Sequence, residues 1–84
     1  MLKLLYFAWV RERTGQGSED VARPDGVATV ADLMAWQAGR GAGYAEAFAD
    51  PARLRVAVNQ EHVGADHPVA DGDEIAFFPP VTGG

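Results

Sequence analysis

Residues 71–84 read DGDEIAFFPPVTGG, and this stretch decides the fold that we expect. Its first three residues predict a turn, and Glu74–Phe78 predicts a strand, because strand-forming residues directly follow turn residues. Pro79 and Pro80 cannot donate to a sheet ladder, so the strand must end before them. The stretch therefore predicts a last strand followed by a short tail that ends in two glycines.

The alternation within this last strand assigns its two faces. We expect Ile75 and Phe77 to face the core, and Ala76 and Phe78 to face outward. Phe7 joins Phe78 on the outer face if the first and last strands pair. Exposed aromatic residues in a contiguous patch usually mark a protein interface. The alternative is that both phenylalanines pack on local loops.

The residues before the last strand predict several strands and one main helix. Thr29, with Asp32 three residues later, resembles the start of a capped helix. Gly39 and Gly41 then stop that helix. Its buried stripe is expected at Val30, Leu33, Met34 and Ala38. The other expected elements are strands over Leu2–Val10, Glu19–Arg23, Arg53–Val58 and Glu61–Val63, a turn at Asn59-Gln60, and helical turns over Tyr44–Ala49.

This order of elements predicts an α+β fold. One main helix packed on one face of a mixed sheet is the natural two-layer arrangement for so short a chain. Pairing of the first strand with the last through a crossover helix gives the β-grasp, or ubiquitin-like, arrangement. We expect residues 1–79 to form this domain and residues 80–84 to form a flexible C-terminal tail.

Composition excludes several functions. The 84 residues include no cysteine, which rules out disulfides, thiolate metal sites and cysteine nucleophiles. The net charge of −5 argues against nucleic acid and against an anionic membrane surface as partner. No apolar run approaches the length of a membrane span. Because the apolar N-terminus lacks the marks of a signal peptide, we expect a cytoplasmic protein.

Other candidate sites are weak. The spacing of His62 and His67, with Asp66 nearby, matches no familiar ligand set, so we expect surface histidines and no metal. The glycine-rich residues 39–43 follow a helix, whereas a phosphate-binding loop follows a strand. Arg11 could hold the tail or a partner carboxylate in a bidentate contact, or it could be a solvated surface arginine.

The tail itself suggests a chemistry. From Pro79 to Gly84 an extended tail reaches roughly 20 Å. Gly83 and Gly84 have no side chains, so they fit a narrow channel and leave the terminal carboxylate unhindered. Activation with ATP to an acyl-adenylate would let a sulfur donor displace AMP and leave a thiocarboxylate at Gly84. The alternative is that the two glycines are a frayed end.

The chain resembles the family of molybdopterin synthase small subunits, the MoaD-type, ubiquitin-like sulfur carriers. The matching segments are residues 4–12 (LLYFAWVRE), Val58-Asn59 and residues 71–84. The resemblance implies a β-grasp fold and a thiocarboxylate at Gly84. It also implies an E1-like adenylating enzyme that uses ATP, and a large synthase subunit as second partner. No cofactor is expected on this chain, which is a sulfur-donating subunit rather than a catalyst on its own.

When the family's functional residues are matched to this sequence by position, the resemblance assigns roles to single residues. The resemblance implies that Gly84 carries the sulfur to cyclic pyranopterin monophosphate and that two large and two small subunits form a heterotetramer. Thr82 departs from the small residue that is usual there and should still thread a channel. The implied tail residues are Val81, Thr82 and Gly83, and the implied interface residues are Phe7, Arg11, Phe78, Pro79 and Pro80.

Three other functions stay open at this point. A thiazole-type sulfur carrier also ends in two glycines but usually lacks the Phe-Phe-Pro-Pro approach. A ubiquitin-like modifier would use the same adenylate and end in an isopeptide bond to lysine. A β-grasp binding module with an inert end belongs to a different class.

Overall fold

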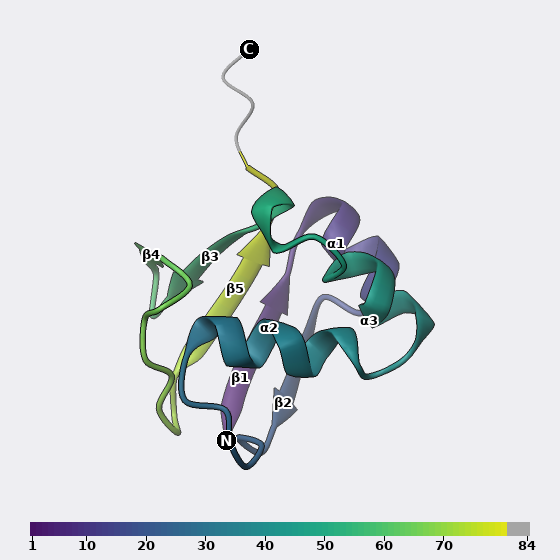
Figure 1. Ribbon diagram of the computed structural model, residues 1–84. Helices are drawn as coiled ribbons and strands as arrows, with labels where there is room; N and C mark the ends of the chain where they lie inside the picture. The colour runs from purple at the N-terminus through teal and green to yellow at the C-terminus, as the bar shows by residue number, and fades with distance from the viewer. Residues whose placement is uncertain (81–84) are drawn as a thin grey trace.

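The computed structural model describes residues 1–80, which form one sheet with helices packed on it (Figure 1). Val81, Thr82, Gly83 and Gly84, which belong to the tail expected over residues 80–84, lie outside the described residues. In chain order the elements are β1 (Leu2–Tyr6), α1 (Ala8–Thr14), β2 (Ser18–Val21), α2 (Val30–Ala38), α3 (Ala42–Ala47), the 3₁₀ turn η1 (Pro51–Arg53), β3 (Arg55–Val58), β4 (Glu61–Val63) and β5 (Glu74–Phe78).

The five strands lie in the order β2-β1-β5-β3-β4. β1 and β5, the first and last strands, pair in parallel at the centre, and the other pairs are antiparallel. α2 crosses one face of this mixed sheet (Figure 1). The expected α+β, β-grasp arrangement is therefore confirmed.

The core lies between α2 and the sheet and follows the alternation of the strands. Leu4 and Tyr6 of β1 and Ile75 and Phe77 of β5 are fully buried, because their side chains share the face that α2 covers. Leu33 meets them from the helix. Thr29 caps α2 in a capping box with Asp32, as expected. Ala38, expected in the buried stripe, is only partly buried.

The expected first strand over Leu2–Val10 is wrong in its second half. β1 ends at Tyr6, the last residue that pairs with β5. Ala8 then takes a left-handed φ of 53° and the chain turns into α1, which was not expected. Val10 is fully buried as a helix residue. Burial of Val10 in the core thus outweighs the local preference of these residues for extended backbone.

Other boundaries shift by a few residues. β2 begins at Ser18 and ends at Val21, so the strand expected over Glu19–Arg23 starts earlier and stops sooner. Arg53, expected in a strand, belongs to η1, and β3 begins at Arg55. The turn at Asn59-Gln60 is confirmed, with positive φ at both residues.

Asn59 ties this turn to the start of β5. Its amide nitrogen donates to Asp73 Oδ1 at 3.0 Å, and its Oδ1 accepts from the Glu74 N–H at 3.0 Å. Asp73 Oδ2 in turn accepts from the Ala70 N–H at 2.8 Å. The turn before β5 is therefore held by side chains as well as by backbone. No helix within residues 1–80 is long and apolar enough to cross a membrane.

Candidate docking site at the root of the tail

The chain leaves the fold at the carboxyl end of β5, beside η1 (Figure 1). Phe77 is fully buried, whereas Phe78, Pro79 and Pro80 are half-buried. The expected inward Phe77 and outward Phe78 are thus confirmed. The two prolines continue directly from the central strand, so the sheet determines where the chain leaves the domain.

Phe7 and Phe78 lie next to each other at this end. Tyr6 pairs with Phe77 in the parallel register, and the Phe7 N–H donates to the Phe77 carbonyl at 3.1 Å. The Phe7 side chain is 49% exposed, the only large hydrophobic residue besides Met1 that is exposed within residues 1–80. The structure therefore brings these two predicted interface residues together, and their role in docking stays a prediction.

The outer face of the sheet carries further apolar residues next to Phe7 and Phe78. Leu5, Ala57 and Ala76 lie on the face that the helices do not cover, as the register of β1, β5 and β3 requires. His62 of β4 contacts Phe78 with its ring tilted by 56°, and the ring centroids are 5.3 Å apart. The face is therefore apolar along its middle.

Arg11 lies on α1, the helix that replaces the second half of the expected first strand. Its guanidinium side chain runs over Gly17, where an added Cβ would lie 3.3 Å from Arg11 Nε. Among residues 1–80 it forms no ion pair. The expected contact of Arg11 with the tail involves residues outside those described.

A cleft behind the tail root was not foreseen from the sequence. Trp9 of α1, Ala52 and Arg53 of η1, and Pro79 and Pro80 line a cleft of about 370 Å³. The Arg53 guanidinium carbon lies 5.2 Å from the centre of the Trp9 ring, a cation–π distance. Only the fold brings these residues together, because α1 and η1 are far apart in the chain.

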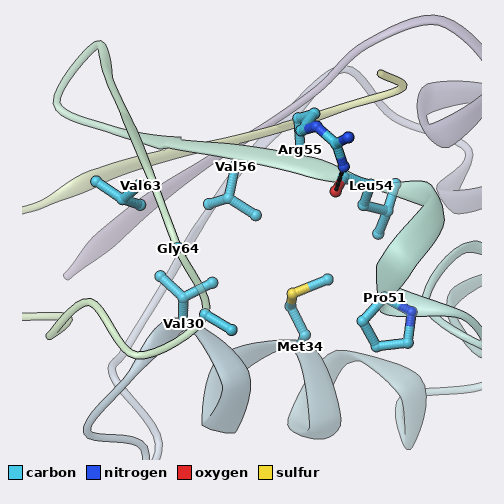
Figure 2. Close-up of a pocket in the computed structure, with 9 residues that line it drawn as sticks. Val30, Met34, Pro51, Leu54, Arg55, Val56, Val63 and Gly64 are labelled. Carbon is cyan, nitrogen blue, oxygen red and sulfur yellow. Dashed lines mark hydrogen bonds between the residues drawn. The ribbon is translucent and has the colours of Figure 1, made fainter.

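A second cleft, of about 330 Å³, lies between α2 and β3 (Figure 2). Val30 and Met34 of α2 face Val56 of β3 across it, and Leu54 and Pro51 close one end. Most of these side chains also belong to the core. This cleft is therefore the open flank of the core and lies away from Phe7.

A polar network joins β1, β2 and the helices. Glu19 accepts from both Nη atoms of Arg40 at 2.7 and 2.8 Å, and from the hydroxyls of Tyr6 and Tyr44 at 2.7 and 2.9 Å. These bonds, the one from Arg40 first, lower the pKa of Glu19 to about 2. Burial, together with the bond to Glu19, raises the pKa of Tyr6. The network holds charge in a fixed place and contains no group poised for proton transfer near pH 7.

His62 and His67 belong to no candidate metal site within residues 1–80. Within residues 1–80 no three His, Asp or Glu side chains lie close enough together to hold a metal ion. His62 lies against the Phe78 ring in a tilted arrangement, and the backbone carbonyl of His67 accepts from the Val30 N–H at the start of α2.

The fold and the exit of its last strand define a ubiquitin-like β-grasp protein. SAMP1 from Haloferax volcanii has this fold, with a TM-score of 0.70, 30% identity, and 99% of this chain and 98% of that chain covered. A chain of the Amycolatopsis orientalis BexX/CysO complex matches with a TM-score of 0.72 and 26% identity, with both chains fully covered.

The chain belongs to the ThiS family, whose model matches residues 4–84. It is 48% identical over 84 residues to the molybdopterin synthase sulfur carrier subunit of Escherichia coli K12, with the whole of both chains covered. The family resemblance inferred from the sequence motifs is therefore confirmed.

Proposed function

We propose that this chain is the sulfur-carrier subunit of molybdopterin synthase and that Gly84 carries the sulfur. The observation that supports this most is the full-length similarity to a subunit of that name, together with a family match that extends to Gly84. The exit of the chain from the central strand through Pro79 and Pro80 supports it as well. The sheet fixes the point at which the chain leaves the domain, and such positioning would help to bring the Gly84 carboxylate to a partner's reactive groups.

The proposed chemistry begins at the Gly84 carboxylate. A carboxylate oxygen attacks the α-phosphorus of ATP, the bond to the β-phosphate breaks, and pyrophosphate leaves. Sulfide then attacks the acyl carbon, a C–S bond forms, and AMP leaves with the bonding electrons. The thiocarboxylate donates its sulfur to cyclic pyranopterin monophosphate, and water restores the carboxylate. Two such transfers complete a dithiolene.

Partners supply the reactive groups in this proposal. An E1-like adenylating enzyme binds the ATP, so this chain needs no cofactor of its own. The large synthase subunit takes the tail and forms a heterotetramer of two large and two small subunits. Because activation consumes ATP, the proposal places the protein in the cytoplasm.

The docking surface of the proposal is the aromatic pair of Phe7 and Phe78 with the prolines that follow. Phe7 is exposed and adjacent to Phe78 on the uncovered face of the sheet. Desolvated aromatic residues dominate the free energy of many interfaces. Arg11 lies on α1, the helix that follows Phe7, and is proposed to pair with a partner carboxylate.

The test uses purified protein, the adenylating enzyme, ATP and sodium sulfide. Intact-protein mass spectrometry should show exchange of one oxygen for sulfur at the C-terminus. The matched control is a variant lacking only Gly84, which should fold normally and show no exchange. Unchanged mass in the wild-type protein, with an activator shown to be active on another carrier, contradicts the proposal.

The products then separate the alternatives. Thiocarboxylated protein mixed with the large subunit and cyclic pyranopterin monophosphate should yield molybdopterin. Sulfur exchange without molybdopterin would indicate a carrier for another pathway, such as the thiazole type. Isopeptide bonds to lysine side chains would indicate a protein modifier, and no adenylate at all would indicate a binding module.

A further inference from the structure

The helices of the protein lie on one face of the sheet and leave its outer face open (Figure 1). Alternation along the strands places Leu5, Ala57 and Ala76 in the middle of this face. At the end where the chain leaves the sheet, Phe78 lies beside Arg55, its partner in the register of β5 and β3. The outer face thus has an apolar middle and, at the tail end, an aromatic ring next to a positive charge.

Charged residues of both signs occupy the other end of the outer face. Lys3 of β1 pairs in register with Glu74 of β5 on one side and with Asp20 of β2 on the other. Paired residues point to the same side of a sheet, so all three side chains lie on the outer face. With Arg55, the strands present two positive and two negative residues on this face, although the whole chain carries a net charge of −5. The excess of negative charge therefore lies on other surfaces.

Charged groups beyond the strand ends border the outer face and are mixed in sign. The elements that carry them are η1 and α1 at the tail end, and the N-terminus with the turns next to it at the other end. These borders favour neither sign, so the charge pattern that a partner must match is the one on the strands. The positive groups of the borders are Arg11, Arg23, Arg53 and the N-terminal ammonium, and the negative groups are Glu12, Asp50 and Asp71.

A second copy of the chain matches the outer face when it is turned end for end. A half-turn about an axis that lies in the sheet and runs across the strands lays outer face on outer face and exchanges the two ends. Arg55 of β3 then meets Glu74 of the second copy, one strand across. Lys3 meets the exposed ring of Phe7 of the second copy, because Phe7 follows Tyr6 at the tail end of β1. Each pairing occurs twice in such an isologous contact, and the apolar middles cover each other.

We propose that the chain forms a weak isologous dimer through this outer face. The second copy is the occupant because one face supplies both members of each matched pair, and because its strand residues carry no net charge that would repel a copy. At the usual spacings, five strands and five residues along each span roughly 24 Å by 16 Å. An area of this size lies at the low end of specific interfaces, so we expect a dissociation constant of about 100 µM.

The dimer would cover Phe7 and Phe78, which are also the aromatic residues of the proposed docking surface. This consequence rests on the proposed function: the carrier would be either self-associated or bound to the large subunit, and its exposed aromatic residues would be shielded while no partner is present. Self-association is measured on the chain alone. A failure of the dimer is therefore distinguishable from a failure of the proposed function.

Sedimentation equilibrium of the full chain, from about 10 µM to about 1 mM, measures the association. The wild type should change from monomer to dimer over this range. Arg55→Glu and Glu74→Arg should each weaken association by at least about tenfold, because each sets like charges against each other twice. An equimolar mixture of these two variants should associate within about threefold of the wild type, since a dimer of one with the other restores both opposite-charge pairs.

The controls carry the same changes in net charge away from the outer face. Arg13 and Glu46 are exposed on α1 and α3, on the side of the sheet that the helices cover. Arg13→Glu and Glu46→Arg should each stay within about twofold of the wild type, and mixing them should bring no gain. Thermal unfolding shows that each variant is folded before its association is measured.

Phe7→Ala gives a second test that does not depend on the folding of Glu74→Arg. It shortens an exposed side chain that faces Lys3 of the second copy, and it should weaken association by about threefold to tenfold. A wild-type chain that stays monomeric at about 1 mM overturns the dimer. A dimer that Arg55→Glu or Phe7→Ala leaves unchanged forms through another face and overturns the proposal, and so does a mixture of folded Arg55→Glu and Glu74→Arg chains that fails to associate.

Discussion

The hydroxyl of Tyr6 donates a 2.7 Å hydrogen bond to Oε2 of Glu19, an oxygen that also accepts from Arg40 at 2.7 Å. Gln37, fully buried on α2, donates to the same Tyr6 hydroxyl at 2.7 Å. Among the described residues, every buried side-chain nitrogen or oxygen has a partner. A satisfied network of this kind fixes β1, β2 and α2 relative to one another, and it is sensitive to the loss of one member.

Glu19→Gln should destabilise the protein by about 2–3 kcal/mol at pH 7, because it leaves the partly buried Arg40 without its counter-charge. An amide also offers only one oxygen where the carboxylate accepts on two. Urea unfolding measures the change. The exposed Glu61→Gln is the control and should stay within about 0.5 kcal/mol of the wild type. Equal stability of the two variants would show that the network contributes nothing.

Stability should fall in acid through the same residue. The pKa of Glu19 lies near 4.5 in an unfolded chain and is lowered to about 2 in the fold. Its contribution is therefore complete above pH 4.5 and is lost as the pH falls toward 2. Hydrogen bonds from the Ala28 and Thr29 N–H groups also lower the pKa of Asp32, so the wild-type curve alone is not specific.

The free-energy difference between wild type and Glu19→Gln isolates the contribution of Glu19. It should shrink steadily between pH 4.5 and 2, as unfolding curves across that range would show. A difference that stays constant over this range contradicts the lowered pKa.

Phe77 and Phe78 are adjacent in β5, and we expect substitution of Phe77 to affect folding and substitution of Phe78 to affect binding. Phe77 is fully buried against Phe48, with ring centroids 4.9 Å apart, so Phe77→Ala should cost about 3–5 kcal/mol. Phe78→Ala should cost little more than about 1 kcal/mol in folding and weaken binding to the large subunit by at least about tenfold. Urea unfolding and calorimetric titration measure the two effects. Unchanged affinity in the folded Phe78→Ala protein would remove Phe78 from the interface.

Gly43 is required for the close approach of two helices. A Cβ on this residue would collide with the backbone carbonyl oxygen of Arg13 at the end of α1. Gly43→Ala should therefore destabilise the protein by about 1–3 kcal/mol, although alanine favours a helix. Gly39→Ala is the matched control, since its nearest atom, the Trp36 carbonyl oxygen, lies at an ordinary 3.6 Å. Thermal unfolding of both variants decides the matter, and equal melting temperatures would refute the collision.

The β3–β4 turn offers a stabilising change. Asn59 and Gln60 have φ of 50° and 69°, a pair of left-handed residues typical of a type I′ hairpin turn. Gln60→Gly should stabilise the protein by about 0.5–1 kcal/mol, because glycine adopts this backbone without strain. Gln60→Ala, which keeps the strain, should give no gain in urea unfolding. A gain in both variants would mean that loss of the glutamine side chain, not relief of the backbone, is responsible.

Local signals predicted the last strand, its two faces and the capped start of α2. Phe77 and Phe78 were assigned correctly because a strand alternates regardless of what it packs against. Thr29 and Asp32 were recognised because a capping box depends on residues three apart. Where a structure is set by neighbours in the chain, one sequence was enough.

Contacts between distant segments were not predictable in this way. α1 was missed because Val10 enters a core that other elements build. Gln37, rather than Ala38, is fully buried because Tyr6 accepts its amide proton, a contact that depends on how α2 lies on β1. Arg53 and Trp9 likewise meet only through the fold.

The central pairing of β1 with β5 has a consequence for synthesis of the protein. The first strand made by the ribosome cannot bury Leu4 and Tyr6 beside Phe77 until the last strand has been translated. Such long-range pairing delays folding and leaves a shorter chain with exposed apolar residues for proteases to remove. A chain that stops before β5 cannot complete this core, so a chain that folds has been translated as far as the root of the tail.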